Sequence, residues 1–318
     1  MKTKYLFTIL IASLCFMTMQ AQEAPSFSVS GSVDTYYRSS EYAPSTSFAD
    51  LNGFALGMAN VVLSYEGEKA GFVADMVYGP RGEAAVFGSQ GNGSNSIVNQ
   101  LYVYYNVSDS FTLTLGNFNT FLGYEVISPA GNFNYSTSYM FSNGPFSHTG
   151  LKADISLSDD ASLMLGVLNT TDATESQPVG DKYMFGAQLG LYGQSINLLT
   201  GQGATQIDYT GGFDISDIFF VGINATKYED DSTEWSGLAL YPQLSISDSF
   251  AMGLRGETFD IKDDNTFTSF TLTGSYTTGN FILKPEIRVD GADKPVSTWS
   301  TVGTDSLSSF VLAAIYTF

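Results

Sequence analysis

Hydrophobic and polar residues alternate one by one over short stretches of this chain. In residues 27–37 every second side chain, starting with Phe27, is mostly apolar, and the side chains between them are mainly serine or aspartate. A repeat of two residues is typical of β-strands whose two faces meet different environments. The same alternation recurs in residues 101–105, 111–115, 151–157, 183–189, 250–257, 269–276 and 283–289. The pattern predicts an all-β fold.

The predicted connections between strands are alternately short and longer. Seven tight turns lie at residues 66–69, 108–110, 158–160, 192–195, 216–217, 247–249 and 278–280. Between them lie eight mostly longer connections, at residues 39–53, 80–96, 117–150, 170–181, 201–205, 229–234, 260–265 and 290–305. Fifteen connections join sixteen strands. The segment 201–205 is the weakest of these assignments, and losing that hairpin would leave fourteen strands.

A soluble sandwich would also alternate, but the connections favour a membrane barrel. Short turns at one end and longer loops at the other are typical of outer-membrane barrels. Beyond the N-terminus no apolar run approaches the ~18 residues that a membrane helix needs, and mean hydropathy is only +0.03. We predict one transmembrane, antiparallel, up-and-down β-barrel of about sixteen strands. Pro285 lies inside a predicted strand, where we expect a β-bulge.

The N-terminus has the features of a secretory signal peptide over residues 1–21. Lys2 and Lys4 precede an apolar stretch, and Ala21 offers a small residue at the cleavage point. Residues 22–318 then form the barrel domain. A lipoprotein anchored through Cys15 is disfavoured, because the preceding Leu14 is too bulky for that processing. Cleavage after Ala21 removes the only cysteine.

Charge and ligand chemistry exclude several classes of function. Without the two signal-peptide lysines the chain has 11 basic and 32 acidic residues, a net charge of −21, which excludes nucleic acid as a partner. One histidine and no remaining cysteine rule out a zinc site, and we expect no metal and no cofactor. Two acidic loops could hold Ca²⁺ or bridge to lipopolysaccharide phosphates, but they lack calcium-loop spacing and are better interpreted as solvated: Glu229, Asp230, Asp231 and Glu234, and Asp260, Asp263 and Asp264.

The connection at residues 117–150 stands apart, because it is rich in aromatic, glycine, asparagine and serine residues and has a single carboxylate, Glu125. It is too irregular for a strand and too apolar for a free loop. It is also the third of the eight longer connections. We predict that it folds into the barrel lumen and narrows the pore. The alternatives are that its aromatic residues pack over the barrel mouth or form a trimer contact.

The same segment carries a resemblance to a known family. Three groups of residues follow in order: Gly123, Tyr124 and Glu125, then Asn134, Tyr135 and Ser136, then Pro145, Phe146, His148, Thr149 and Gly150. This order resembles the OmpL-like outer-membrane β-barrel porins of Gram-negative bacteria. Thr137 and Ser138 stand where such motifs have a basic residue. The strand count is similar to that of general porins, in which the third loop enters the lumen.

The predicted site has two parts. The constriction loop contributes Tyr124, Glu125, Tyr135, Tyr139, Phe141 and, at its base, His148. The pore wall contributes Lys152, Asp154, Arg255, Glu257, Lys284, Glu286 and Arg288. Wall charges facing Glu125 would set an electric field across the constriction and sort solutes by charge. Replacing Arg255 by leucine would then mainly alter conductance.

His148 is the single histidine and allows two interpretations. It could be the catalytic base of an outer-membrane lipase on the barrel's outer surface. Because no Gly-X-Ser-X-Gly segment accompanies it, a hydrogen-bonded anchor at the loop base is favoured. We predict no catalytic residue and no enzymatic activity.

The C-terminus completes the prediction. Phe310, Leu312, Ala314, Tyr316 and the terminal Phe318 are spaced by two, which resembles the signal read by the barrel assembly machinery. The other expected partners are outer-membrane lipids and lipopolysaccharide, and a homotrimer is left open. We predict an outer-membrane porin, a passive diffusion channel for small hydrophilic solutes with a modest cation preference. The alternatives are a non-conducting structural or adhesive barrel and, well behind, a barrel enzyme.

Overall fold

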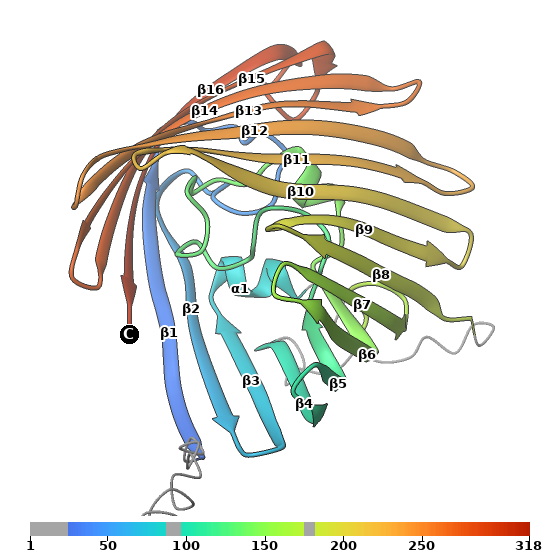
Figure 1. Ribbon diagram of the computed structural model, residues 1–318. Coiled ribbons are helices and arrows are strands. Elements are labelled where there is room, and N and C mark those ends of the chain that lie inside the picture. Colours follow the sequence, from blue (N-terminus) through green and yellow to red (C-terminus); the bar gives the residue numbers. More distant parts are fainter. Residues whose placement is uncertain (1–24, 87–96, 175–181) are drawn as a thin grey trace, which may run out of the picture.

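The computed structural model describes residues 25–86, 97–174 and 182–318, and within them sixteen strands close into one antiparallel barrel (Figure 1). The strands are β1 (Ser26–Arg38), β2 (Gly53–Glu66), β3 (Ala70–Tyr78), β4 (Val98–Ser108), β5 (Phe111–Asn119), β6 (Ser147–Ser158), β7 (Ala161–Leu168), β8 (Met184–Leu191), β9 (Gln194–Gly201), β10 (Ala204–Ser216), β11 (Phe219–Glu229), β12 (Glu234–Ser247), β13 (Phe250–Ile261), β14 (Asn265–Thr278), β15 (Phe281–Val296) and β16 (Thr304–Thr317). Two short helices are α1 (Pro80–Ala85) and α2 (Tyr139–Asn143). No helix in the described residues is long and apolar enough to cross a membrane.

The strand order is strictly up and down, and the last strand closes on the first. Each strand pairs with its sequence neighbours, and β16 pairs with β1. The Gly31 N–H donates to the Phe318 carbonyl and the Phe318 N–H donates to the Gly31 carbonyl, both at 3.0 Å. Closure satisfies the backbone groups that an open sheet would leave at its edges. The predicted sixteen-strand barrel is confirmed.

The two ends of the barrel differ in their connections. We call the end with the seven predicted tight turns the turn end and the opposite one the loop end. The weakest predicted hairpin, at residues 201–205, is present, but Gln202 and Gly203 alone join β9 to β10. Their φ angles of 54° and 89° are both positive, as a type I′ turn requires. The loop end therefore also contains a tight turn. The predicted signal peptide lies outside the described residues.

Pro285 lies in β15, and the prediction of a bulge there is wrong. Thr273 pairs with Glu286 and Tyr276 pairs with Leu283, so the register of β14 against β15 is unchanged across the proline. The ladder simply skips the pairs at Pro285 and its neighbour. A missing N–H therefore leaves a gap in the hydrogen bonds without adding a residue. The register shift in β15 lies further on, between Gly291 and Val296.

Side chains along the wall alternate between lumen and lipid in the predicted register. Leu254 and Ile287 are 37% and 54% exposed, whereas the next residues, Arg255 and Arg288, are almost fully buried. The outer surface also exposes apolar side chains such as Leu101, Leu115 and Phe185. An outward apolar band around a polar interior is the arrangement of a transmembrane barrel.

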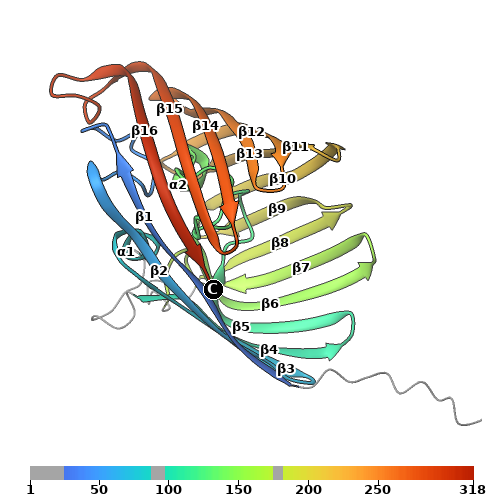
Figure 2. The same cartoon turned by 90° about the vertical axis from the view of Figure 1, so that its left-hand side faces the viewer.

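The lumen is filled at the loop end and open at the turn end. In β1 and β12 the inward side chains near the loop end are buried, and the residues at the turn end are exposed. Figures 1 and 2 show the chain between β5 and β6 inside the ring of strands, beside α1. Phe48, Ile127, Phe141 and Phe146 form one apolar cluster there with Val77 of the wall. The long third connection thus folds into the lumen, as predicted.

Candidate functional site

The site is built around residues 120–146, which we call the inner loop. It leaves β5 at Asn119, crosses the lumen and returns to β6 at Ser147. Most of it is irregular, and α2 is its one helical turn. The Ser138 hydroxyl caps that turn by accepting the Phe141 N–H at 3.0 Å. A loop held inside a barrel must find partners for its backbone groups there.

Two wall glutamates supply acceptors for the loop backbone. Glu286 accepts the N–H groups of Tyr135 and Ser136, at 2.8 and 3.1 Å, one on each carboxylate oxygen. Glu257 accepts the N–H groups of Tyr139 and Met140 in the same way, at 3.0 and 2.9 Å. Each carboxylate therefore holds two consecutive amides through charge-assisted hydrogen bonds.

Wall cations supply donors for the loop carbonyls. Arg255 Nη1 donates to the Ser136 carbonyl at 2.6 Å. Arg288 Nη1 donates to the Thr137 carbonyl at 2.8 Å. Lys284 Nζ donates to the carbonyls of Pro129, at 3.0 Å, and Asn132. The lumen face of β13, β14 and β15, which carries these anchors, is called the anchored wall.

Glu125, the one acidic residue of the inner loop, is paired with the wall. Its Oε1 lies 2.6 Å from Arg255 Nη1, and its Oε2 accepts the Ser138 N–H at 2.8 Å. Both side chains of the ion pair are almost fully buried. A buried ion pair is tolerated where hydrogen bonds satisfy its remaining atoms, as they largely do here. Glu125 therefore does not face Arg255 across open water.

The other predicted loop residues are mostly packed as well. The Tyr135 hydroxyl donates to Asp34 Oδ2 at 2.5 Å, and the Tyr139 hydroxyl donates to Asp290 Oδ1 at 3.1 Å. Phe141 stacks on Phe146 with ring centroids 4.7 Å apart. Of the predicted loop residues, Tyr124 and Glu125 line a cavity described below.

Side chains of the inner loop pack against glycines on the lumen face of the wall. These glycines were not predicted from the sequence. A Cβ on Gly222 would lie 2.4 Å from the Tyr124 hydroxyl, and one on Gly253 would lie 2.4 Å from the Phe133 ring. A Cβ on Gly237 would lie 2.4 Å from Met140 Cγ. Glycine allows such close approach because it has no side chain. The sequence signal for these contacts was a glycine at an inward position of a strand, in a barrel whose inner loop is rich in aromatic residues.

His148 lies at the base of the loop, on the inside of the barrel. It is fully buried, its Nε2 is 2.9 Å from Thr120 Oγ1, and the Phe121 ring centroid is 5.0 Å away. Its Nδ1 has no partner among the described residues. The lipase hypothesis needs a histidine on the outer surface, and this histidine is not there.

Asp172, in the connection between β7 and β8, closes the loop base from the other side. Its Oδ1 accepts the N–H groups of Phe146 and Ser147, at 2.7 and 2.9 Å. Burial raises the pKa of this carboxyl to about 6, and the two backbone N–H groups oppose the rise because they favour the charged form. Asp172 is not among the residues predicted from the sequence.

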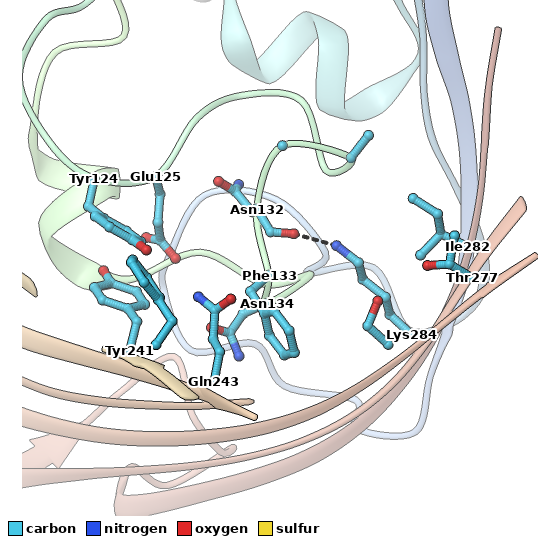
Figure 3. Close-up of a pocket in the computed structure, with 14 residues that line it drawn as sticks. Tyr124, Glu125, Asn132, Phe133, Asn134, Tyr241, Gln243, Thr277, Ile282 and Lys284 are labelled. Carbon is cyan, nitrogen blue, oxygen red and sulfur yellow. Dashed lines mark hydrogen bonds between the residues drawn. The ribbon is translucent and has the colours of Figure 1, made fainter. Parts of the chain in front are cut away.

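A cavity of about 560 Å³ lies between the inner loop and the lumen face of β11, β12, β14 and β15, and it is called the anchored-wall cavity. Figure 3 shows Tyr124 and Tyr241 at one side of it and Lys284 with Ile282 at the other. The two tyrosine rings stack with centroids 4.3 Å apart. The cavity opens among residues from the turn-end parts of the wall, such as Thr277.

A second cavity, of about 290 Å³, lies along β4 to β8 and is called the open-wall cavity. Lys152 and Asp154 line it and form an ion pair at 2.7 Å, with side chains that are 23% and 42% exposed. The lumen face of these strands is called the open wall. Of the seven predicted wall residues, these two face accessible space as a pair, while the other five are buried.

Two further buried carboxylates are held by amide side chains. Asp75 accepts from Asn60, Asn99 and Gln100. Asp208 accepts from Asn197 at 2.7 Å and from the Gly123 N–H of the loop at 2.9 Å. No group of His, Cys, Asp and Glu side chains in the described residues is arranged to hold a metal ion.

Comparison with known proteins places these features in a family. The family described as "Putative beta-barrel porin-2, OmpL-like" matches residues 26–318. No curated protein sequence matches the chain.

Several solved outer-membrane structures share the fold. The outer membrane channel DcaP of Acinetobacter baumannii has a TM-score of 0.63 at 13% identity, covering 93% of this chain and 98% of that one. An anion-selective porin from Comamonas acidovorans has a TM-score of 0.63 at 12% identity, covering 92% and 100%. OmpT of Vibrio cholerae has a TM-score of 0.57 at 11% identity, covering 93% and 98%.

Proposed function

Since the chain belongs to the OmpL-like β-barrel porin family, we propose that this outer-membrane barrel is a passive diffusion channel for small hydrophilic solutes. The inner loop sets its size limit. The family and the fold favour a channel over an enzyme. Phe318 stays the predicted residue for recognition by the assembly machinery, and a homotrimer stays open.

The observation that carries the proposal is that the inner loop fills only part of the lumen. Spaces of about 560 and 290 Å³ remain on its two sides, both with polar lining residues. A barrel of sixteen strands would otherwise enclose a wide aqueous channel. A fixed loop that leaves polar side spaces is a direct way to restrict solute size.

Charge selection is assigned to the open wall in this proposal. Glu125 pairs with Arg255 and Arg288 pairs with Asp290, while Glu257, Lys284 and Glu286 are hydrogen-bonded to the loop backbone. Lys152 and Asp154 keep contact with solvent and can act on passing ions. The chain without its predicted signal peptide, with a net charge of −21, favours cations at the mouth, and we expect a modest cation preference.

A second candidate is a non-conducting structural or adhesive barrel. The observation that favours it is the filling of the loop end, where residues such as Phe48, Trp299 and Arg81 are buried together with the inner loop. The two candidates differ in whether ions cross the protein.

Planar-bilayer recording of the refolded barrel tests the proposal. We expect discrete single-channel currents from the wild type and a conductance at least about twofold higher after deletion of residues 132–141, because the deletion widens the lumen. Deletion of residues 231–232, in an exposed turn between β11 and β12, is the matched control and should leave conductance unchanged. Silent wild-type protein that conducts only after the deletion of residues 132–141 would favour the structural barrel.

A further inference from the structure

The anchored-wall cavity has a chemical character that the channel proposal does not require. Its charged lining residues are already committed to partners. Glu125 is held by Arg255 and by the Ser138 N–H, and Lys284 donates to two loop carbonyls. An ionic solute would have to compete with these contacts. The cavity therefore gives an ion few contacts that would replace those it makes with water.

Four aromatic side chains line the cavity, Tyr124, Phe133, Phe220 and Tyr241. Tyr124 stacks on Tyr241, and Phe133 packs against Gly253. Phe220 of β11 also lines the cavity and lies against Gly212. Tyr241 is almost fully buried, whereas Tyr124, Phe133 and Phe220 keep part of their surface exposed at the cavity. The negative face of an aromatic ring attracts the slightly positive C–H groups of a solute ring.

Neutral polar groups also line the cavity. The Gln243 amide lies within hydrogen-bond reach of the Tyr124 hydroxyl, and Ser275 and Thr277 add two hydroxyls. Figure 3 shows Gln243 beside Tyr241 and Thr277 beside Ile282, on opposite sides of the cavity. Such groups both donate and accept hydrogen bonds without carrying charge.

The combination of aromatic faces, neutral donors and acceptors, and committed charges matches one solute class. Sugar rings have apolar C–H faces and a rim of hydroxyl groups. The volume of about 560 Å³ lies within the usual range of small-molecule sites, about 300–1,000 Å³. We propose that the anchored-wall cavity is a binding subsite for an uncharged mono- or disaccharide on its way through the channel. That the sugar passes through the protein rests on the proposed channel function. That it binds rests on the cavity alone.

Calorimetry and bilayer recording test the two parts separately. The probe is maltose titrated into the refolded, detergent-solubilised barrel, with glucosamine and glucuronate as charged comparisons. We expect weak, saturable maltose binding and at least about tenfold weaker binding of both charged sugars. Gln243→Leu and Tyr124→Ala should each weaken maltose binding about tenfold, because they remove a hydrogen-bonding group or a stacking face.

Controls keep the result interpretable. Asp154→Asn changes the open-wall cavity and should leave maltose binding unchanged. Thr277→Val keeps the shape of an exposed side chain, so a loss of binding in it cannot be blamed on unfolding. Absence of maltose binding in a barrel that conducts would overturn the inference and leave the channel intact, as would equal binding of the charged sugars. Maltose binding to a barrel that never conducts would support the subsite and overturn the channel.

Discussion

The two sides of the lumen use similar charged residues in opposite ways. On the anchored wall Arg255, Glu257 and Glu286 are buried and bound to the inner loop. On the open wall Lys152 and Asp154 pair with each other and remain partly exposed. Both sets alternate with apolar residues along a strand, so the local pattern is the same. The two walls differ in their contacts with the inner loop, which binds the charges of the anchored wall and leaves the Lys152–Asp154 pair partly exposed.

The reason lies in the backbone of the inner loop. An irregular segment away from bulk water must hydrogen-bond its amides and carbonyls to the protein. The anchored wall provides many of those partners. The open wall includes β5 and β6, which pair with each other in the sheet, and it contacts the start of the loop, where Gln188 donates to the Phe121 carbonyl at 3.2 Å. Charges on the anchored wall thus hold the loop, and in the proposed channel the partly exposed charges of the open wall are the ones that act on solutes.

The largest expected effect comes from removing a charge of the anchored wall. Arg255→Leu leaves Glu125 buried without its partner, and we expect a loss of about 3–5 kcal/mol in the free energy of unfolding. Lys152→Leu, on the open wall, should cost at most about 1 kcal/mol. Urea unfolding in lipid vesicles, followed by tryptophan fluorescence, measures both. Equal stability losses would show that the two walls do not differ in this way. The contacts thus replace the expectation that Arg255→Leu mainly alters conductance.

A smaller loss is expected on the outer face of the same strands. Arginine at Leu254 or Ile287 would place a charge in lipid and should cost about 2–4 kcal/mol if the site lies at the bilayer midplane. Glu68→Arg, in the exposed turn between β2 and β3, is the control and should have almost no effect. Unchanged stability of Ile287→Arg would contradict the assigned register.

A glycine of the anchored wall tests the seating of the loop. Gly253→Ala would place a Cβ 2.4 Å from the Phe133 ring, so the ring and the loop must shift. We expect a loss of about 1–3 kcal/mol from overpacking, together with a change in conductance. Gly256→Ala in the same strand meets no atom closer than 3.5 Å and is the matched control. Identical unfolding curves for the two variants would mean that the packing of Phe133 does not require a glycine at position 253.

Much of the barrel could be predicted from the sequence, because its strands repeat every two residues and its turns are local signals. The strand number, the closure and the entry of the third loop followed from those patterns. The partners of the loop did not, because the Glu257 contacts lie more than a hundred residues apart in the sequence. The structural roles of Asp34 and Gly253 were missed for the same reason. Long-range pairing depends on how an irregular backbone crosses the lumen, which no local pattern records.

The smallest expected effect concerns ion selectivity and compares the two carboxylates most directly. Asp154→Asn removes a partly exposed charge next to the open-wall cavity, so the ratio of cation to anion permeability should fall, by less than about twofold because solvent screens the charge. Glu125→Gln alters a closed ion pair and should change that ratio less while reducing stability. Reversal potentials across a salt gradient measure the ratio. The difference should shrink as salt rises, since the screening length falls from about 10 Å at 0.1 M to about 3 Å at 1 M. A larger selectivity change in Glu125→Gln would place the effective charge in the inner loop and reverse the assignment of the two walls.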